Sequence, residues 1–307
     1  MITSLFTKSK PINFIIVFFI TVLAFLTARA ETEISLITTG YIFKQVVIFL
    51  ICIGTVLVYN FIITKNSFTK NGYYEILIFS LFFLTFVQTT NNTNILLSNF
   101  FVLLGVRRII SLRSQRSVKK KLFDAALWIG VASLFYFWAI LFFVVIILSL
   151  ILYTDTNLRH WILPFLGTGA VFVIAMSISI VAYDDFFELF NALLGVSYDF
   201  TVYNSTHYLV AITMILSFGI WSSIFYLQNI KHKKKDSRAS FKIIIIAAII
   251  AFLIVIQAPR KSGSEFLFLF APLSIIITNY IEIIKDNWFR EIFVSILICI
   301  PFLLLVL

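Results

Sequence analysis

Eleven apolar segments follow one another along the chain, with only short polar stretches between them. A helix that crosses a membrane needs about 17–25 mostly apolar residues. The segments cover residues 12–29, 42–63, 74–89, 95–111, 122–137, 138–153, 162–183, 209–227, 243–258, 266–284 and 292–307. This pattern predicts an all-α polytopic transmembrane helix bundle of about eleven spans, within about 10–12, that forms a single integral membrane domain over residues 1–307.

The composition agrees with this fold class and excludes a water-soluble domain. The chain is 61% hydrophobic and 12% charged, whereas soluble domains average about 45–50% apolar and about 25% charged residues. The surplus apolar surface must face lipid. The net charge of +10 belongs to short loops beside the apolar segments. There it sets topology and contacts lipid headgroups, so we expect membrane lipid and no nucleic acid as a partner.

The first apolar segment has features of a signal peptide. Lys8 and Lys10 precede it, and the small residues around Arg29 resemble a cleavage site. However, the run from Ile12 to Ala28 is long and many further spans follow it. We therefore interpret it as the first transmembrane helix.

Residues 122–153 are too long for one ordinary span. As one helix they would extend about 48 Å at 1.5 Å per residue, and the hydrocarbon core is about 30 Å thick. The positive-inside rule places the basic clusters 107–121 and 231–242 on the same side of the membrane. An even number of crossings must separate them, so we predict two short helices with a tight turn near residues 136–138.

The resulting topology is strongly asymmetric in basic charge. It places 20 of the 24 Lys and Arg residues on the cytoplasmic side, and only Arg29, Lys44, Arg260 and Lys261 outside. We therefore expect a multi-pass protein of a bacterial inner membrane, with its N-terminus in the cytoplasm and its C-terminus in the periplasm.

The outer face is expected to be rich in acidic residues. Glu31 and Glu33 follow the first span, and carboxylates there suit a general base or a ligand of a divalent metal ion. Acidic residues outside the membrane also arise without any function. Further acidic candidates on this face are Asp184, Asp185, Glu188 and Glu265.

The longest outer loop predicts an amphipathic helix on the membrane surface over residues 184–195. Asp184 and Glu188 are four residues apart and share one helical face. The apolar face consists of Phe186, Phe187, Leu189, Phe190, Leu193 and Leu194. Such a helix forms either a plain interfacial element or an acidic mouth over a membrane cavity.

Arg260 and Lys261 are adjacent cations on the side of the membrane that disfavours them. A phosphate or pyrophosphate ligand would hold them there, although a pair that snorkels at a helix end explains the same pattern. Because two neighbouring cations repel, we expect Glu31 or Glu33 to approach them around an outward-opening cavity.

Several other site classes have no sequence signal. The chain has no P-loop, dinucleotide-binding fingerprint, nucleophile elbow or zinc motif. No series of acidic residues runs through the spans, which argues against an ion-coupled pump or transporter. Cys52 and Cys299 lie in apolar runs, and we expect no disulfide.

Two segments resemble parts of the C-type (GT-C) glycosyltransferases. Residues 124–148 are similar to a paired short-helix segment of these enzymes, and residues 260–272 are similar to their basic outer loop, apolar run and proline. The resemblance implies a GT-C-like arrangement and transfer of sugar from a polyprenyl phosphate. Glu31 and Glu33 would then be catalytic, and Arg260 and Lys261 would bind the lipid phosphate.

The chain departs from that family in three ways. Glu stands in the first outer loop where Asp is usual, the paired segment lacks its customary basic residue before proline, and no large outer domain is present. The chain also resembles an uncharacterised family of bacterial polytopic inner-membrane proteins of similar length. The alternative function is therefore a non-catalytic membrane subunit of an envelope, protein-export or protein-modification complex, which the small loops favour.

Overall fold

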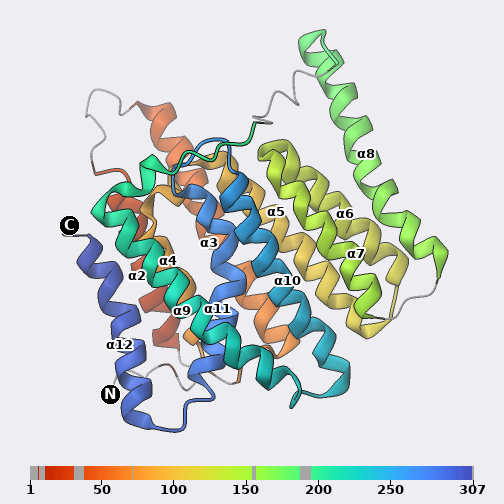
Figure 1. Cartoon of the computed structure of the whole chain (residues 1–307). Coiled ribbons are helices and arrows are strands. Elements are labelled where there is room, and N and C mark those ends of the chain that lie inside the picture. Colours follow the sequence, from red (N-terminus) through yellow and green to blue (C-terminus); the bar gives the residue numbers. More distant parts are fainter. Residues whose placement is uncertain are drawn as a thin grey trace. The chain divides into compact units, whose positions relative to one another are not determined.

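The computed structural model describes residue 6 and residues 11–30, 38–70, 72–153, 157–186 and 195–305 (Figure 1). Within these ranges the protein is helical and contains no strand. Its α-helices are α2 (Pro11–Thr27), α3 (Thr39–Asn66), α4 (Tyr74–Thr85), α5 (Thr93–Ile110), α6 (Val118–Phe135), α7 (Phe142–Leu152), α8 (Leu158–Tyr183), α9 (Thr206–Ile230), α10 (Lys235–Gln257), α11 (Leu267–Ile281) and α12 (Asn287–Leu304). Short 3-10 helices join several of them, namely η2 (Val87–Thr90), η3 (Ser111–Ser114), η4 (Phe137–Leu141), η6 (Thr201–Asn204) and η7 (Ser264–Phe266).

Each predicted apolar segment coincides with one of these helices. The helices often extend past the apolar part, most clearly in α10, which begins at Lys235 rather than at residue 243. Asp236 lies in its first turn, where an acidic side chain interacts favourably with the helix dipole. The all-α fold class is thus confirmed.

Seven helical segments of the described chain are long and apolar enough to cross a membrane. They are Thr39–Asn66, Thr93–Ser114, Leu158–Tyr183, Thr206–Ile230, Lys235–Gln257, Ser264–Ile281 and Asn287–Leu304. Three shorter apolar helices cover Pro11–Thr27, Tyr74–Thr85 and Phe137–Leu152. The protein is therefore rich in membrane-type helices, and the finer count of eleven spans stays a proposal.

The long apolar stretch 122–153 is divided as expected. Helix α6 ends at Phe135, and Tyr136 adopts an extended conformation with φ −147° and ψ 105°. The 3-10 helix η4 then leads into α7, which packs against α6. The prediction of two short helices with a break at residues 136–138 is confirmed.

The described residues form two compact units. The first contains α2, α3, α4, α9, α11 and α12, and the second contains most of α5 together with α6, α7, α8 and α10. The expectation of a single domain stays a prediction. A compact unit is a separate domain only if it folds alone, and compactness does not show that.

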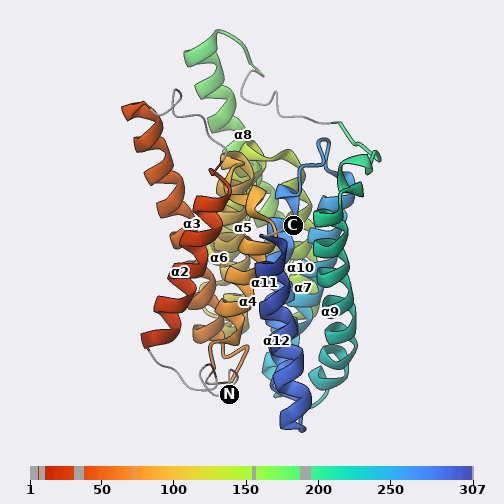
Figure 2. The same cartoon turned by 90° about the vertical axis from the view of Figure 1, so that its left-hand side faces the viewer.

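Helices α4 and α11 form the interior of the first unit. Every residue of both helices is buried, with α2, α3, α9 and α12 packed around them (Figures 1 and 2). The ring of Phe270 contacts Phe79, Phe82, Phe83 and Phe86 at centroid distances of 5.4–6.3 Å. A helix that is apolar all round suits such an interior position.

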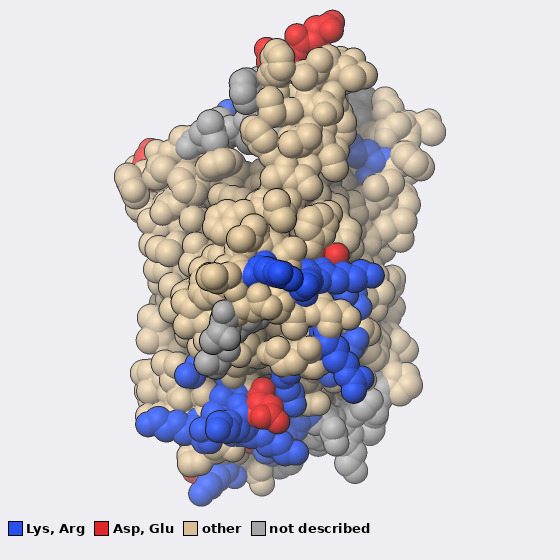
Figure 3. Space-filling model, turned by 90° about the vertical axis from the view of Figure 1, so that its right-hand side faces the viewer, with Lys and Arg blue, Asp and Glu red and all other residues tan. Residues whose placement is uncertain are grey.

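In the second unit, the two basic clusters lie at one end. The hydroxyl of Tyr153 bonds to the Ile110 carbonyl at 3.4 Å and to the Ser240 hydroxyl at 3.1 Å, so the end of α5 meets the start of α10. Helix α10 also packs against η3, which carries Arg113. Lys and Arg side chains gather in the lower part of the face that Figure 3 shows. That an even number of membrane crossings separates the clusters stays a prediction.

Candidate functional site

Segments that are far apart in the sequence meet at one end of the first unit, which we call the Arg29 end. It comprises residues 28–30, 44–45, 86–94, 200–208 and 261–266. Asn91 Nδ2 donates to the Ala28 carbonyl at 2.9 Å, and Ser264 Oγ donates to the Gln88 carbonyl at 3.0 Å. The charge pattern of the sequence assigns all of these segments to the outer side, so the structure brings them together at the same end.

A polar cavity of about 530 Å³ lies at the Arg29 end, and we call it the amide pocket. Four of its lining side chains are carboxamides and one is the ammonium-bearing Lys44. The full lining consists of Lys44, Gln88, Asn91, Asn92, Thr93, Asn94, Ser262 and Ser264. Carboxamides both donate and accept hydrogen bonds, so the pocket suits a ligand with several hydroxyl groups and a negative charge.

Helix α3 presents Lys44 from its second turn, and the chain between α4 and α5 together with the first turn of α5 supplies the amides. Helix α4 ends at Thr85, and η2 turns the backbone before α5 starts at Thr93. Within this turn, the side chain of Asn92 accepts from the backbone N–H of Ile95 at 3.2 Å. The polar run at 91–94 thus caps the start of α5 and also lines the amide pocket.

Arg29 is a half-buried cation that joins three elements. Its Nε donates to Gln45 Oε1 on α3 at 2.5 Å, and its Nη2 donates to the Thr90 carbonyl on η2 at 2.8 Å. Its Nη1 donates to the Phe25 carbonyl at 3.0 Å and to Thr90 Oγ1 at 3.1 Å. The guanidinium carbon also lies 3.5 Å from the centre of the Phe25 ring.

Among the described residues, the partners of Arg29 are all neutral, namely a carboxamide, a hydroxyl and two backbone carbonyls. A partly desolvated cation whose described partners are neutral attracts an anionic ligand, because charge-assisted hydrogen bonds are the stronger ones.

Glu265 is fully buried and organises the loop before α11. Tyr203 donates a hydrogen bond to its Oε1, and the Ser262 hydroxyl donates to its Oε2 at 3.2 Å. The Ser262 N–H also points at the carboxylate, 3.2 Å from Oε1. With these donors on its oxygens, Glu265 serves as the anchor of the loop.

Gly263 lets this loop pack against α9. Its φ of 82° is in the left-handed region, and a Cβ atom there would lie 2.6 Å from Cε1 of Tyr208. The Tyr208 hydroxyl donates to the Ser262 carbonyl at 2.8 Å on the same loop. Glycine is therefore required by both the backbone conformation and the close approach of the tyrosine ring.

Lys261 is buried beside the same loop, with 7% of its surface exposed. Its ammonium lies 4.8 Å from the centre of the Phe200 ring. Burial lowers the pKa of Lys261, and the negative charge of Glu265 partly offsets this effect. The hydrogen bond from the Thr201 N–H, at 2.9 Å, lowers the pKa of the nearby exposed Asp199.

The candidate residues from the sequence are distributed unevenly. Glu31, Glu33 and Glu188 lie outside the described residues, as does most of the surface helix expected over 184–195. The expected contact of Glu31 or Glu33 with Arg260 or Lys261 therefore stays a prediction. Asp184 ends α8 in a left-handed conformation, and Asp184, Asp185 and Arg260 are exposed in the second unit. Lys261 and Glu265 share one loop of the first unit.

Sequence reasoning missed the amide pocket. The run Asn91–Asn92–Thr93–Asn94 between two apolar segments was its signal, because so many carboxamides are unusual at a short membrane turn. Within the described part of the chain, no group of three or more His, Cys, Asp or Glu residues is placed to hold a metal ion.

Comparisons with known proteins identify a family but no activity. A family model described as a family of unknown function (DUF6427) matches residues 1–306. No curated protein and no solved structure matches the chain. The function must therefore be argued from the geometry of the Arg29 end.

Proposed function

We propose a function on the premise that the chain belongs to the DUF6427 family, whose function is unknown. The protein is an integral protein of the bacterial inner membrane that acts in envelope biogenesis. It binds a polyprenyl-phosphate-linked sugar at the amide pocket and transfers the sugar to an acceptor hydroxyl, in the manner of GT-C enzymes. The observation that carries the proposal is the pocket itself, which combines four carboxamides with Lys44 at the end of a membrane-type helix bundle.

The lining of the pocket matches the two chemical parts of such a ligand. Carboxamide side chains bind sugar hydroxyls, since each offers two donors and one acceptor. A lysine ammonium binds phosphate as a point charge. The cavity of about 530 Å³ lies within the range of about 300–1,000 Å³ that small-molecule sites occupy.

The topology of the proposal is the eleven-span one, with a cytoplasmic N-terminus and a periplasmic C-terminus. The positions of the basic residues support this topology. Three of the four cations assigned to the outer side, namely Arg29, Lys44 and Lys261, lie at the same end of the first unit. This arrangement would place the pocket at the depth of the outer lipid headgroups.

Catalysis is assigned to Glu31 or Glu33. Glu31 is two residues from Arg29 in the sequence, which associates it with the Arg29 end. The carboxylate would take the proton of the acceptor hydroxyl while the oxygen forms a bond to the anomeric carbon. The bond from that carbon to the phosphate oxygen breaks, and the phosphate leaves with the electron pair, stabilised by Lys44.

A second candidate function is that of a non-catalytic subunit of a membrane complex. The C-terminal half of α8 favours it, because this part of the second unit presents exposed apolar side chains, among them Val173 at 62% and Val181 at 88% exposure. A helix from a partner protein would cover such a surface as well as lipid does. The loop anchor Glu265 fits this alternative equally, since its bonds are structural.

Ligand binding by the purified protein tests the proposal. Lys44→Met and Asn92→Ala should each weaken the binding of a glucose-linked polyprenyl phosphate about tenfold, which corresponds to about 1.4 kcal/mol. Lys285→Met is the matched control, because Lys285 is an exposed lysine in the loop between α11 and α12, outside the pocket. Affinities equal to that of the control would overturn the proposal. Glu31→Gln and Glu33→Gln should preserve binding, and at least one of them should abolish transfer.

A further inference from the structure

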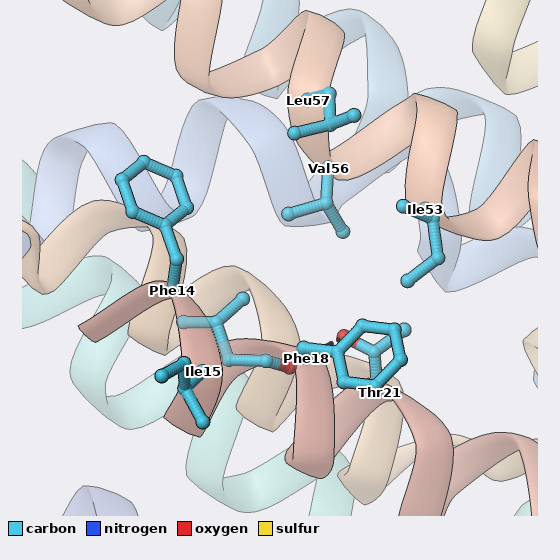
Figure 4. Close-up of a pocket in the computed structure, with 8 residues that line it drawn as sticks. Phe14, Ile15, Phe18, Thr21, Ile53, Val56 and Leu57 are labelled. Carbon is cyan, nitrogen blue, oxygen red and sulfur yellow. Dashed lines mark hydrogen bonds between the residues drawn. The ribbon is translucent and has the colours of Figure 1, made fainter. Parts of the chain in front are cut away.

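An apolar groove lies between α2 and α3 in the first unit, well away from the amide pocket along both helices. Figure 4 shows Phe14, Phe18 and Thr21 of α2 facing Ile53, Val56 and Leu57 of α3 across a cavity of about 280 Å³. The one polar side chain among them is Thr21, whose hydroxyl donates to the Val17 carbonyl of its own helix at 2.8 Å. The groove thus offers hydrocarbon contacts and no hydrogen bonds.

The groove opens sideways toward the surroundings of the helices. Phe18 is 45% exposed and Leu57 is 53% exposed, and α2 and α3 lie side by side on one face of the first unit (Figure 2). Its volume is slightly below the range of drug-sized sites. A single hydrocarbon chain entering from the bilayer fits these dimensions.

The two helices are joined at the Arg29 end, beyond the groove. Arg29 bonds to Gln45, and the rings of Phe25 and Phe49 meet at 5.1 Å. On α2, residues 14, 18 and 25 share one helical face. Arg29 follows the end of α2 at Thr27, and its Nη1 bonds back to the carbonyl of Phe25 on that face.

The distance between Arg29 and the groove matches the dimensions of a lipid leaflet. Phe18 and Arg29 are eleven residues apart, which is about 16 Å along a helix. Half of the hydrocarbon core of a bilayer is about 15 Å thick. A lipid whose phosphate meets Arg29 would place part of its tail in the groove.

The charge of Arg29 selects an anionic headgroup. Among the described residues, its four hydrogen bonds go to neutral acceptors and use four of the five guanidinium N–H groups, so the fifth N–H has no described acceptor.

We infer that the groove between α2 and α3 binds an acyl chain of an anionic phospholipid whose phosphate is held by Arg29. This lipid site is separate from the amide pocket, so the inference stands or falls without the transferase function. The bound lipid would help to hold α2 against α3 along the groove.

Photo-crosslinking in nanodiscs tests this inference. The probes are phosphatidylglycerol and phosphatidylcholine with a diazirine in one acyl chain, and labelled peptides are identified by mass spectrometry. We expect phosphatidylglycerol to label peptides containing residues 14–21 or 53–57 about fivefold more than phosphatidylcholine does, since one basic residue near an anionic lipid contributes about that factor. Ile53→Trp should fill the groove and remove this labelling.

Matched variants keep the test decisive. Val47→Trp makes the same kind of change at a 40% exposed position of α3 outside the groove and should label like the unmodified protein. Arg29→Gln should abolish the preference for phosphatidylglycerol. Equal labelling by both lipids, or labelling that survives Ile53→Trp, would overturn the inference and identify bulk lipid. Displacement of the probe by polyprenyl phosphate would also overturn it, and would instead extend the transferase ligand into the groove.

Discussion

The guanidinium of Arg29 holds both polar groups of Thr90, its hydroxyl at 3.1 Å and its carbonyl at 2.8 Å. Sixty-one residues separate these partners in the sequence. The contact connects the end of α2 to η2, next to the turn that lines the amide pocket. A single side chain thus joins the end of α2 to both α3 and η2.

Substitution of Arg29 by lysine should destabilise the protein even though the charge is kept. A lysine lacks the planar fork and cannot bond Gln45 and Thr90 together. Because hydrogen bonds to charged groups contribute about 1.5–3 kcal/mol, we expect the free energy of unfolding in detergent to fall by about 2 kcal/mol. Lys44→Met, at an exposed position, should change it by less than about 0.5 kcal/mol. Equal effects of both variants would contradict the joining role of Arg29.

Substitution of Gly263 by alanine should disrupt the loop that carries Lys261 and Glu265. The residue has φ 82°, and the new Cβ would lie 2.6 Å from the Tyr208 ring. We expect a loss of about 1–3 kcal/mol in the free energy of unfolding, measured by thermal denaturation in detergent. Gly40→Ala is the control, since Gly40 lies in the first turn of α3 and a Cβ added there would meet no atom within 4 Å. A stable Gly263→Ala protein would show that the loop tolerates another conformation.

The buried Lys261 should make the stability of the protein depend on alkaline pH. Its pKa in the folded state is below the ordinary 10.5, so the unfolded chain binds more protons than the folded one between these two values. Stability should therefore rise as the pH increases through the folded pKa toward 10.5. The Lys261→Met variant should lack this increase, measured as the unfolding temperature across the alkaline range. The Lys285→Met control should keep this increase. Identical pH profiles for the unmodified protein and both variants would show that the pKa of Lys261 is not lowered.

Cysteine labelling should show that the Arg29 end and the basic clusters lie on opposite sides of the membrane. Single cysteines at Lys44, Lys120 and Lys234 are introduced in a Cys299→Ala background, in which the buried Cys52 stays unreactive. An impermeant maleimide should label position 44 in intact cells, and positions 120 and 234 only after permeabilisation. Labelling of 120 and 234 from different sides would contradict an even number of crossings between them. Labelling of positions 120 and 234 in intact cells, with position 44 labelled only after permeabilisation, would contradict the assigned orientation but not the even number of crossings.

The sequence by itself determined the helical class and the order of the apolar helices along the chain. Apolar segments of this length must form helices in lipid, because only a helix satisfies their backbone polar groups within the segment. The break at Tyr136 followed from the excessive length of residues 122–153 combined with the charge rule. The gathering of basic residues at one end of the second unit followed from the same rule.

Only the tertiary structure decided which residues meet at the Arg29 end. The sequence placed Arg29, Lys44 and Glu265 on the outer side, but it did not indicate that Arg29 meets Thr90 or that Glu265 is bound by Tyr203. The amide pocket depends on which helix neighbours which, and several apolar helix faces suit the same neighbour almost equally well. In lipid, helix association depends on close packing and interhelical hydrogen bonds rather than on hydrophobicity. That information lies in the shape of the facing side chains, which hydropathy does not record.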